Sequence, residues 1–164
     1  MLRRILLTAT LVLSACSNVE DVPLPFTSTN EKATEFFNKA VNHFDQGEWQ
    51  EARDNFQSAL RVDPNFIMAN MWGWSEDPVQ TRKYRETAIA NKENANDAEE
   101  IMIEMLEARR KGKASERLEL AKELVNKYSS SSEAHVILGN VYTGQDNLDK
   151  AIESYENALK VNPD

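Results

Sequence analysis

The fold is decided by residues 132–163, which read SEAHVILGNVYTGQDNLDKAIESYENALKVNP. Small and apolar residues recur there at helical spacing, which predicts two short helices that touch where their side chains are small. The same pattern occurs 99 residues earlier, in residues 33–64, without a gap. The matched pairs are Ala40 with Gly139, Ala52 with Ala151, Phe56 with Tyr155, Ala59 with Ala158, Leu60 with Leu159, Val62 with Val161 and Pro64 with Pro163. Self-similarity at a fixed spacing indicates a repeat protein, and this spacing is about three periods of 33.

The pattern resembles the tetratricopeptide repeat, a helix–turn–helix unit of about 34 residues with the form W-x2-L-G-x2-Y, then A-x3-F, then P. The last copy has Leu138, Gly139 and Tyr142 at these places, with His135 at the tryptophan place. The first copy departs further and has His43 at the tyrosine place. The resemblance implies an all-α fold, a right-handed α-solenoid of about four repeats whose middle two are degenerate.

Apolar periodicity and helix signals predict the helices between the two clear copies. Helical segments are expected at residues 29–46, 49–62, 65–74, 78–90, 98–111 and 115–128. Ser28 with Glu31, and Asp77 before Pro78, have the spacing of helix N-caps. Gly47 and Gly112 are expected to end helices. Residues 65–74 predict a short helix, so the second repeat is degenerate.

The first residues are typical of a secretory leader, with Arg3 and Arg4 before a mostly apolar run over residues 5–13. Residues 13–16 read Leu-Ser-Ala-Cys and resemble the lipobox of bacterial lipoproteins. The resemblance implies cleavage before Cys16, acylation of its thiol and amine by palmitate-type chains, and a lipoprotein of the outer membrane facing the periplasm. An ordinary signal peptide with an incidental cysteine is the alternative. The expected organisation is a signal peptide at 1–15, a lipidated cysteine and flexible tether at 16–28, and the repeat domain at 29–164.

Composition and motifs narrow the class of function. The net charge of −8 argues against nonspecific nucleic-acid binding, which needs a basic face. The sequence lacks a phosphate loop, a Cys-x-x-Cys pair and a catalytic constellation, so we expect no enzyme activity, no cofactor and no metal site. His43 and His135 are interpreted as packing residues, and Trp72 and Trp74 as core residues.

In the resembled family the first helix of each repeat lines the concave face. The positions implied here are Phe37, Asn38, Val41 and Phe44 in the first repeat, Met102, Ile103, Leu106, Arg109 and Arg110 in the third, and Val136, Ile137 and Asn140 in the fourth. Apolar walls with the pair Arg109 and Arg110 predict an extended or helical peptide that carries an acidic residue. A solvated helix C-terminus is the alternative for that pair. The carboxylate clamp of chaperone-binding relatives is not reproduced, because Phe37 and Val41 stand at two of its places.

The expected function is therefore a lipid-anchored protein-interaction adaptor of the bacterial envelope. Its partner is a protein segment in the groove. Residues 162–164 follow the last repeat directly, without the solvating helix that usually covers the last apolar face of such an array. Two alternatives follow: a self-associating module, which forms a homo-oligomer through this face, or the N-terminal docking or sensor part of a longer enzyme or regulator.

Overall fold

The structure is a computed structural model that describes residues 20–28 and 30–163, so the expected leader and Cys16 lie outside the described residues. The described residues form eight α-helices, one 3-10 turn and no strand. The elements are α1 (Glu31–Asp45), α2 (Trp49–Val62), α3 (Ile67–Trp72), α4 (Pro78–Ala90), η1 (Lys92–Asn94), α5 (Asp97–Arg110), α6 (Ala114–Lys127), α7 (Ser132–Thr143) and α8 (Leu148–Val161). The prediction of an all-α fold is confirmed.

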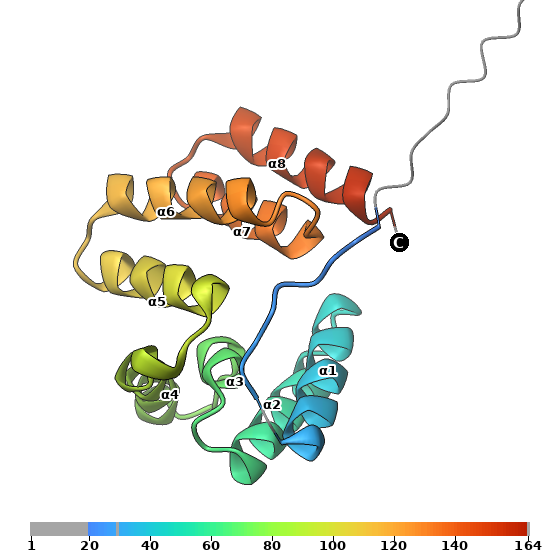
Figure 1. Cartoon of the computed structure of the whole chain (residues 1–164), viewed down its shortest axis with the longest axis vertical. Coiled ribbons are helices and arrows are strands. Elements are labelled where there is room, and N and C mark those ends of the chain that lie inside the picture. The colour runs from blue at the N-terminus through green and yellow to red at the C-terminus, as the bar shows by residue number, and fades with distance from the viewer. Residues whose placement is uncertain (1–19, 29, 164) are drawn as a thin grey trace, which may run out of the picture.

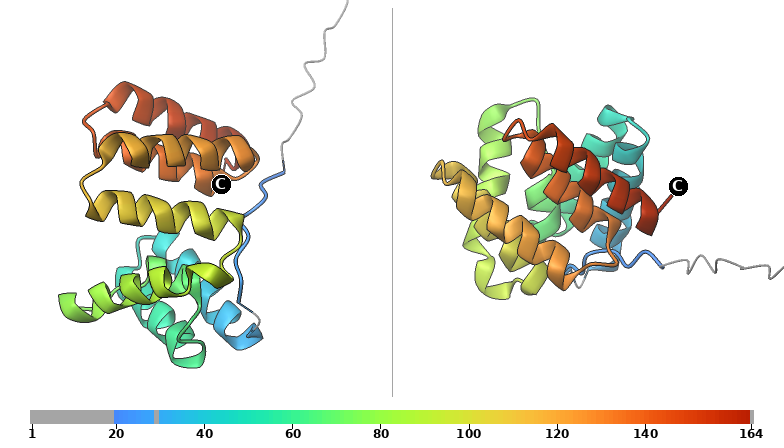
Figure 2. Two further views of the ribbon diagram at one scale, coloured as in Figure 1. Left: turned by 60° about the vertical axis from the view of Figure 1, so that its left-hand side comes forward. Right: turned by 90° about the horizontal axis from the view of Figure 1, so that it is seen from above.

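The helices form hairpins that stack into a curved solenoid (Figure 1). The pairs in most extensive contact are α1 with α2, α5 with α6, and α7 with α8. The second hairpin is the degenerate one, because α3 is only 6 residues long. Figure 2 shows the curvature from two further sides. The C-terminal end of α1 lies opposite α7, because residues of both helices line one groove. The solenoid therefore has an inner face that is enclosed by its first and last helices.

The repeat register read from the sequence is reproduced in the helix bounds. Helix α2 spans Trp49–Val62 and α8 spans Leu148–Val161, so the two helices begin and end 99 residues apart. Ala40 and Ala52 are fully buried where α1 packs on α2, which is why both positions need small side chains. Gly47 has φ of +76° and allows the tight turn between these helices.

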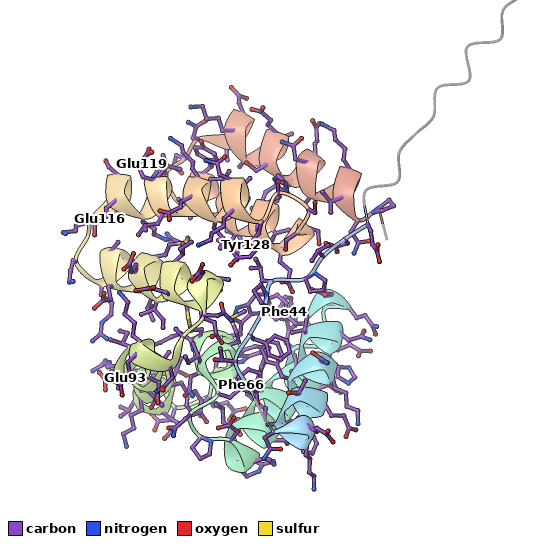
Figure 3. The ribbon with its side chains drawn as sticks, in the orientation of Figure 1. Phe44, Phe66, Glu93, Glu116, Glu119 and Tyr128 are labelled. Atoms are coloured by element: carbon purple, nitrogen blue, oxygen red, sulfur yellow. The ribbon has the colours of Figure 1, made fainter. Side chains whose placement is uncertain are left out.

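Phenylalanines form the core of the first half. The ring of Phe37 on α1 lies 5.7 Å from that of Phe56 on α2 and 5.0 Å from that of Phe66 before α3. Figure 3 shows Phe66 among these rings, whereas Phe44 lies nearer the opening between α1 and the later helices. Aromatic pairs at this spacing add about 0.5–1.5 kcal/mol each beyond burial of their area. Trp72 and Trp74 are half-buried and pack against this core.

Residues 20–28, which we call the strap, differ from the expected flexible tether. One end of the strap binds the last hairpin. The carboxylate of Asp21 accepts hydrogen bonds from the Ser132 N–H at 2.9 Å, the Ser132 hydroxyl at 2.7 Å and the Asn162 side chain at 2.9 Å. The Leu24 N–H donates to Oε2 of Glu133 at 3.0 Å.

The other end of the strap binds α1, the segment before α3, and α5. The Phe26 ring lies 5.4 Å from the rings of both Phe37 and Phe66. The Thr27 N–H and hydroxyl donate to the two carboxylate oxygens of Glu99, at 3.1 and 2.7 Å. The strap therefore crosses from α7 to α1 and closes the ring of helices on one side (Figure 1).

The strap binds because of its proline spacing. Pro23 and Pro25 fix an extended backbone and face solvent, while the intervening Leu24 is only 2% exposed. Phe26 continues the same alternation toward the core. Two prolines in a stretch without helical periodicity are typical of a linker, so the sequence interpretation missed this short alternating pattern.

Candidate binding groove

A groove of about 830 Å³ lies on the inner face of the solenoid. Its walls are formed by the C-terminal part of α1, by α3, by the end of α5, by α7 and by α8. The lining side chains are Val41, Phe44, Asp45, Met71, Trp72, Arg109, Ser132, Glu133, Val136, Ile137, Asn140, Tyr155, Ala158, Leu159 and Asn162.

The middle of the groove is apolar and open to solvent. Phe44 is 36% exposed, Val136 is 40% exposed and Leu159 is 60% exposed. The Phe44 ring is fixed edge-on against Trp49 at 5.0 Å and Trp72 at 6.1 Å. Large apolar side chains that remain exposed in a concave surface are typical of a protein or peptide contact.

Six of the twelve positions implied by the family resemblance line this groove: Val41, Phe44, Arg109, Val136, Ile137 and Asn140. Asn38 is exposed outside it, and Leu106 is half-buried elsewhere. Arg110 points to α4, where its guanidinium lies 3.7 Å from the Glu86 carboxylate. The predicted pair of arginines is therefore split, and only Arg109 faces the groove.

Three implied positions are buried instead of lining the groove. Phe37 is 5% exposed, because Phe26 of the strap covers the part of the inner face to which it belongs. Met102 is 6% exposed and Ile103 is fully buried in the middle of α5. The family pattern carries no signal for the strap, so it could not show which part of the concave face is covered.

The sequence interpretation also missed the contribution of α8. Tyr155 reaches the groove because Gly139 on α7 lets its ring pack directly on the helix backbone. A Cβ atom at Gly139 would lie 2.5 Å from a ring carbon of Tyr155. The Tyr155 hydroxyl donates to Oδ1 of Asn140 at 2.8 Å. The sequence signal for this contact was a glycine, Gly139, followed 16 residues later by a tyrosine, Tyr155.

One end of the groove, near the strap, is acidic. Burial raises the pKa of Glu133 despite the hydrogen bond from the Leu24 N–H, and the charges of Asp21 and Asp45 raise it further. Burial also raises the pKa of Asp45. Burial opposes ionisation of Asp21 too, but the hydrogen bonds from Ser132 and Asn162 outweigh it and lower the pKa of that carboxyl.

The two histidines lie outside the groove. Both are half-buried and hydrogen-bonded: His43 Nδ1 lies 2.6 Å from Oε2 of Glu48, and His135 Nε2 lies 3.1 Å from the Ser129 carbonyl oxygen. Their rings therefore make polar contacts at the ends of their helices and do not fill the core as expected. Within residues 20–28 and 30–163, no cluster of three or more metal-ligating side chains is present. None of the described helices has the length and hydropathy needed to cross a bilayer.

Two family models described as tetratricopeptide repeat match the chain, at residues 33–66 and 132–164. No curated protein matches the sequence. A thermophilic tetratricopeptide repeat protein of Thermus thermophilus is a similar solved structure, at 18% identity and a TM-score of 0.46, covering 81% of this chain and 75% of that one. MamA of Desulfovibrio magneticus has 16% identity and a TM-score of 0.39, covering 83% and 78%. The first tetratricopeptide repeat domain of Spaghetti, bound to an HSP90 peptide, has 17% identity and a TM-score of 0.32, covering 82% of each chain. The chain is thus an all-helical solenoid with a tetratricopeptide repeat at each end, at residues 33–66 and 132–164, and such repeats form protein–protein interaction modules.

Proposed function

We propose that this protein is a lipid-anchored adaptor of the bacterial envelope, which docks a segment of another protein in its groove. The observation that carries the docking part is the exposure of Phe44, Val136 and Leu159 toward one concave space. Burying such side chains against a partner contributes about 25 cal/mol for each Å² of apolar surface removed from water. Rigid aromatic contacts hold Phe44 in place before binding, which lowers the ordering cost.

The anchoring part is supported by residues 13–16 and by the position of the strap. Three residues separate Cys16 from Glu20, the first described residue of the strap. Four residue steps span at most about 14 Å, because an extended chain advances about 3.3–3.6 Å per residue. A lipidated Cys16 would therefore hold the groove close to the bilayer surface. The anchor would raise the local concentration of the adaptor around membrane partners.

The anchor is tested with Cys16→Ser in the full chain. Wild type should incorporate labelled palmitate and fractionate with membranes, whereas the variant should lose the label and enter the soluble fraction. Ser14→Ala is the matched control, because it keeps a small residue and the cysteine. Equal membrane retention without label in Cys16→Ser would exclude lipid anchoring.

Docking is tested by photocrosslinking in the native envelope. A photoreactive residue replaces Val136 in the groove, and a second version replaces Val79 on α4, which is 53% exposed outside the groove. We expect a heterologous crosslink at position 136 that disappears with Phe44→Ala, and none of the same mass at position 79. Equal crosslinks at both positions would contradict a specific groove.

Self-association is a second candidate, favoured by one face of α8. Leu148 is 61% exposed and Ile152 is 55% exposed, and both lie outside the groove at a spacing of one helical turn. Sedimentation of the full chain in detergent over a hundredfold concentration range tests it. A dimer mass that Ile152→Asp returns to the monomer would support self-association, whereas a constant monomer mass would exclude it.

A further inference from the structure

Arg109, which lines the groove, is one of three arginines that have no carboxylate partner in the part of the chain that the structure describes. These are Arg85 on α4, Arg109 on α5 and Arg117 on α6. Among the ion pairs of residues 20–28 and 30–163, none includes any of the three. The neighbouring cations Arg110 and Lys111 do have acidic partners, Glu86 and Glu107. The three arginines therefore differ from their paired neighbours Arg110 and Lys111.

The three arginines lie on the successive helices α4, α5 and α6. Arg85 is held in place by hydrogen bonds to the carbonyl oxygens of Asn70 and Gly73, at 2.5 and 2.7 Å. Arg117 lies beside the turn after α7, with a guanidinium nitrogen 3.9 Å from where a Cβ of Gly144 would be. Burial lowers the pKa of Arg85 and of Arg117, and the charge of Arg109 lowers both further. The charge of Arg109 therefore repels both, and Arg109 itself lines the groove.

A favourable interaction with a helix dipole can explain the position of only one of these arginines. Arg109 is in the last turn of α5, where a cation is favourable. Arg117 is the fourth residue of α6, close to the positive end of that helix, where a cation is unfavourable. Arg85 is in the interior of α4. Three like charges held close together cost free energy, which a bound anion would offset.

The opposite end of the groove has the opposite sign. Asp45 is the last residue of α1, and Glu133 is in the first turn of α7. Asn140, near the C-terminal end of α7, also lines the groove. Positions 133 and 140 are separated by seven residues of helix, or about 10 Å at 1.5 Å per residue. The groove is therefore apolar in the middle and oppositely charged at its two ends.

We infer that the groove selects a peptide segment with a carboxylate for the arginine end, apolar side chains for the middle, and a basic residue for the end at Asp45 and Glu133. The inference rests on the proposed docking function and adds the chemistry of the docked segment. A carboxylate at Arg109 can accept a pair of guanidinium hydrogen bonds.

The test is selection of a random dodecapeptide library, displayed on phage, against the detergent-purified full chain. Enriched peptides should carry Asp or Glu on one side of an apolar run and Lys or Arg on the other. Synthetic copies are then titrated by fluorescence anisotropy against wild type, Arg109→Gln, Arg117→Gln and the matched control Arg110→Gln. Circular dichroism melting verifies that each variant is folded.

Arg109→Gln should weaken binding by about three- to tenfold, as expected for loss of a half-exposed ion pair with good geometry. Arg110→Gln should change the affinity by less than about twofold, because its side chain points to α4. Replacing the acidic residue of the peptide by its amide should cancel the effect of Arg109→Gln. Enriched peptides that lack the charge pattern, or equal losses for Arg109→Gln and Arg110→Gln, would overturn the charge selection and leave docking intact. Failure to enrich any peptide would count against docking itself.

Discussion

The first and last hairpins of this solenoid have the same sequence pattern 99 residues apart, yet the same positions have different roles. Phe56 is fully buried, whereas its counterpart Tyr155 is half-buried at the groove. Leu60 is 8% exposed and its counterpart Leu159 is 60% exposed. A repeat pattern therefore specifies how two helices pack on each other. Whether a side chain that points away from its own hairpin is buried or exposed depends on the elements that pack on that hairpin.

In the first hairpin, those elements are α3 and the residues after it. Gly73 lies so close to α2 that a Cβ there would be 3.3 Å from Cβ of Phe56 and 3.5 Å from Leu60. No described residue covers Leu159 in the same way. Tyr155 compensates with polar contacts, because its hydroxyl bonds Asn140 and lies 3.2 Å from Oγ1 of Thr143.

The largest expected difference is between Phe56→Ala and Tyr155→Ala. The first should lower the free energy of unfolding by about 3–5 kcal/mol, because it leaves a cavity in a closed core. The second should cost about 1–2 kcal/mol, because its ring is already partly in water. Urea unfolding followed by circular dichroism measures both. Equal losses would mean that the two hairpins share one kind of core.

The strap offers a second way to distinguish the two hairpins, because Asp21, near its N-terminal end, binds only the last hairpin. Asp21→Asn should cost about 1–2 kcal/mol at pH 7, since charge-assisted hydrogen bonds become neutral ones. The pKa of Asp21 is lower in the folded protein than its ordinary value of 3.8. Its contribution to the free energy of unfolding is therefore fully present above pH 3.8, and it is lost as the pH falls through the lower, folded-state pKa.

Thermal melting of wild type and Asp21→Asn between pH 7 and pH 2 is the measurement. The gap in melting temperature should persist at neutral pH and close in strong acid. Glu20→Gln, an exposed neighbour, is the control and should leave no gap. A gap that stays constant to pH 2 would contradict the role of the Asp21 carboxylate.

Gly139→Ala tests the close contact that exists only in the last hairpin. The new methyl group collides with the Tyr155 ring, which should lower the free energy of unfolding by about 2 kcal/mol. Alanine has the higher helix propensity, which should raise it by about 1 kcal/mol and so offset half of the loss. The net loss should be about 1 kcal/mol in wild type. In a Tyr155→Ala background the sign should reverse to a gain of about 1 kcal/mol, because only the propensity remains. The same sign in both backgrounds would exclude the contact as the cause.

The smallest effect is expected at the turns. Asp146 has φ of +56° where the first hairpin has Gly47 at +76°. Asp146→Gly should raise the free energy of unfolding by about 0.5 kcal/mol, because glycine adopts this backbone without strain but loses more entropy on folding. Gly47→Asp should lower it by a similar amount. Denaturant titration in triplicate resolves the two signs, and a loss with Asp146→Gly would contradict the turn equivalence.

The hairpins and their register could be predicted because small residues mark helix crossings and recur at a fixed distance. Half of the implied positions line the groove for the same reason. Phe37, Met102 and Ile103 are buried instead, because burial there depends on the strap and on packing in the divergent middle repeats. The strap itself depends on contacts between residues distant in the sequence, such as Thr27 with Glu99. No periodic pattern encodes contacts of that kind.

The strap also determines where a mechanical load on the N-terminus enters the molecule. A pull along the chain reaches Asp21 first, so it acts on Ser132 and Asn162 of the last hairpin before the first helix. The stacked rings around Phe26 resist only after these bonds and that of Leu24 with Glu133 have separated. Because Ser132, Glu133 and Asn162 also line the groove, tension at the N-terminus is transmitted directly to the wall of the groove.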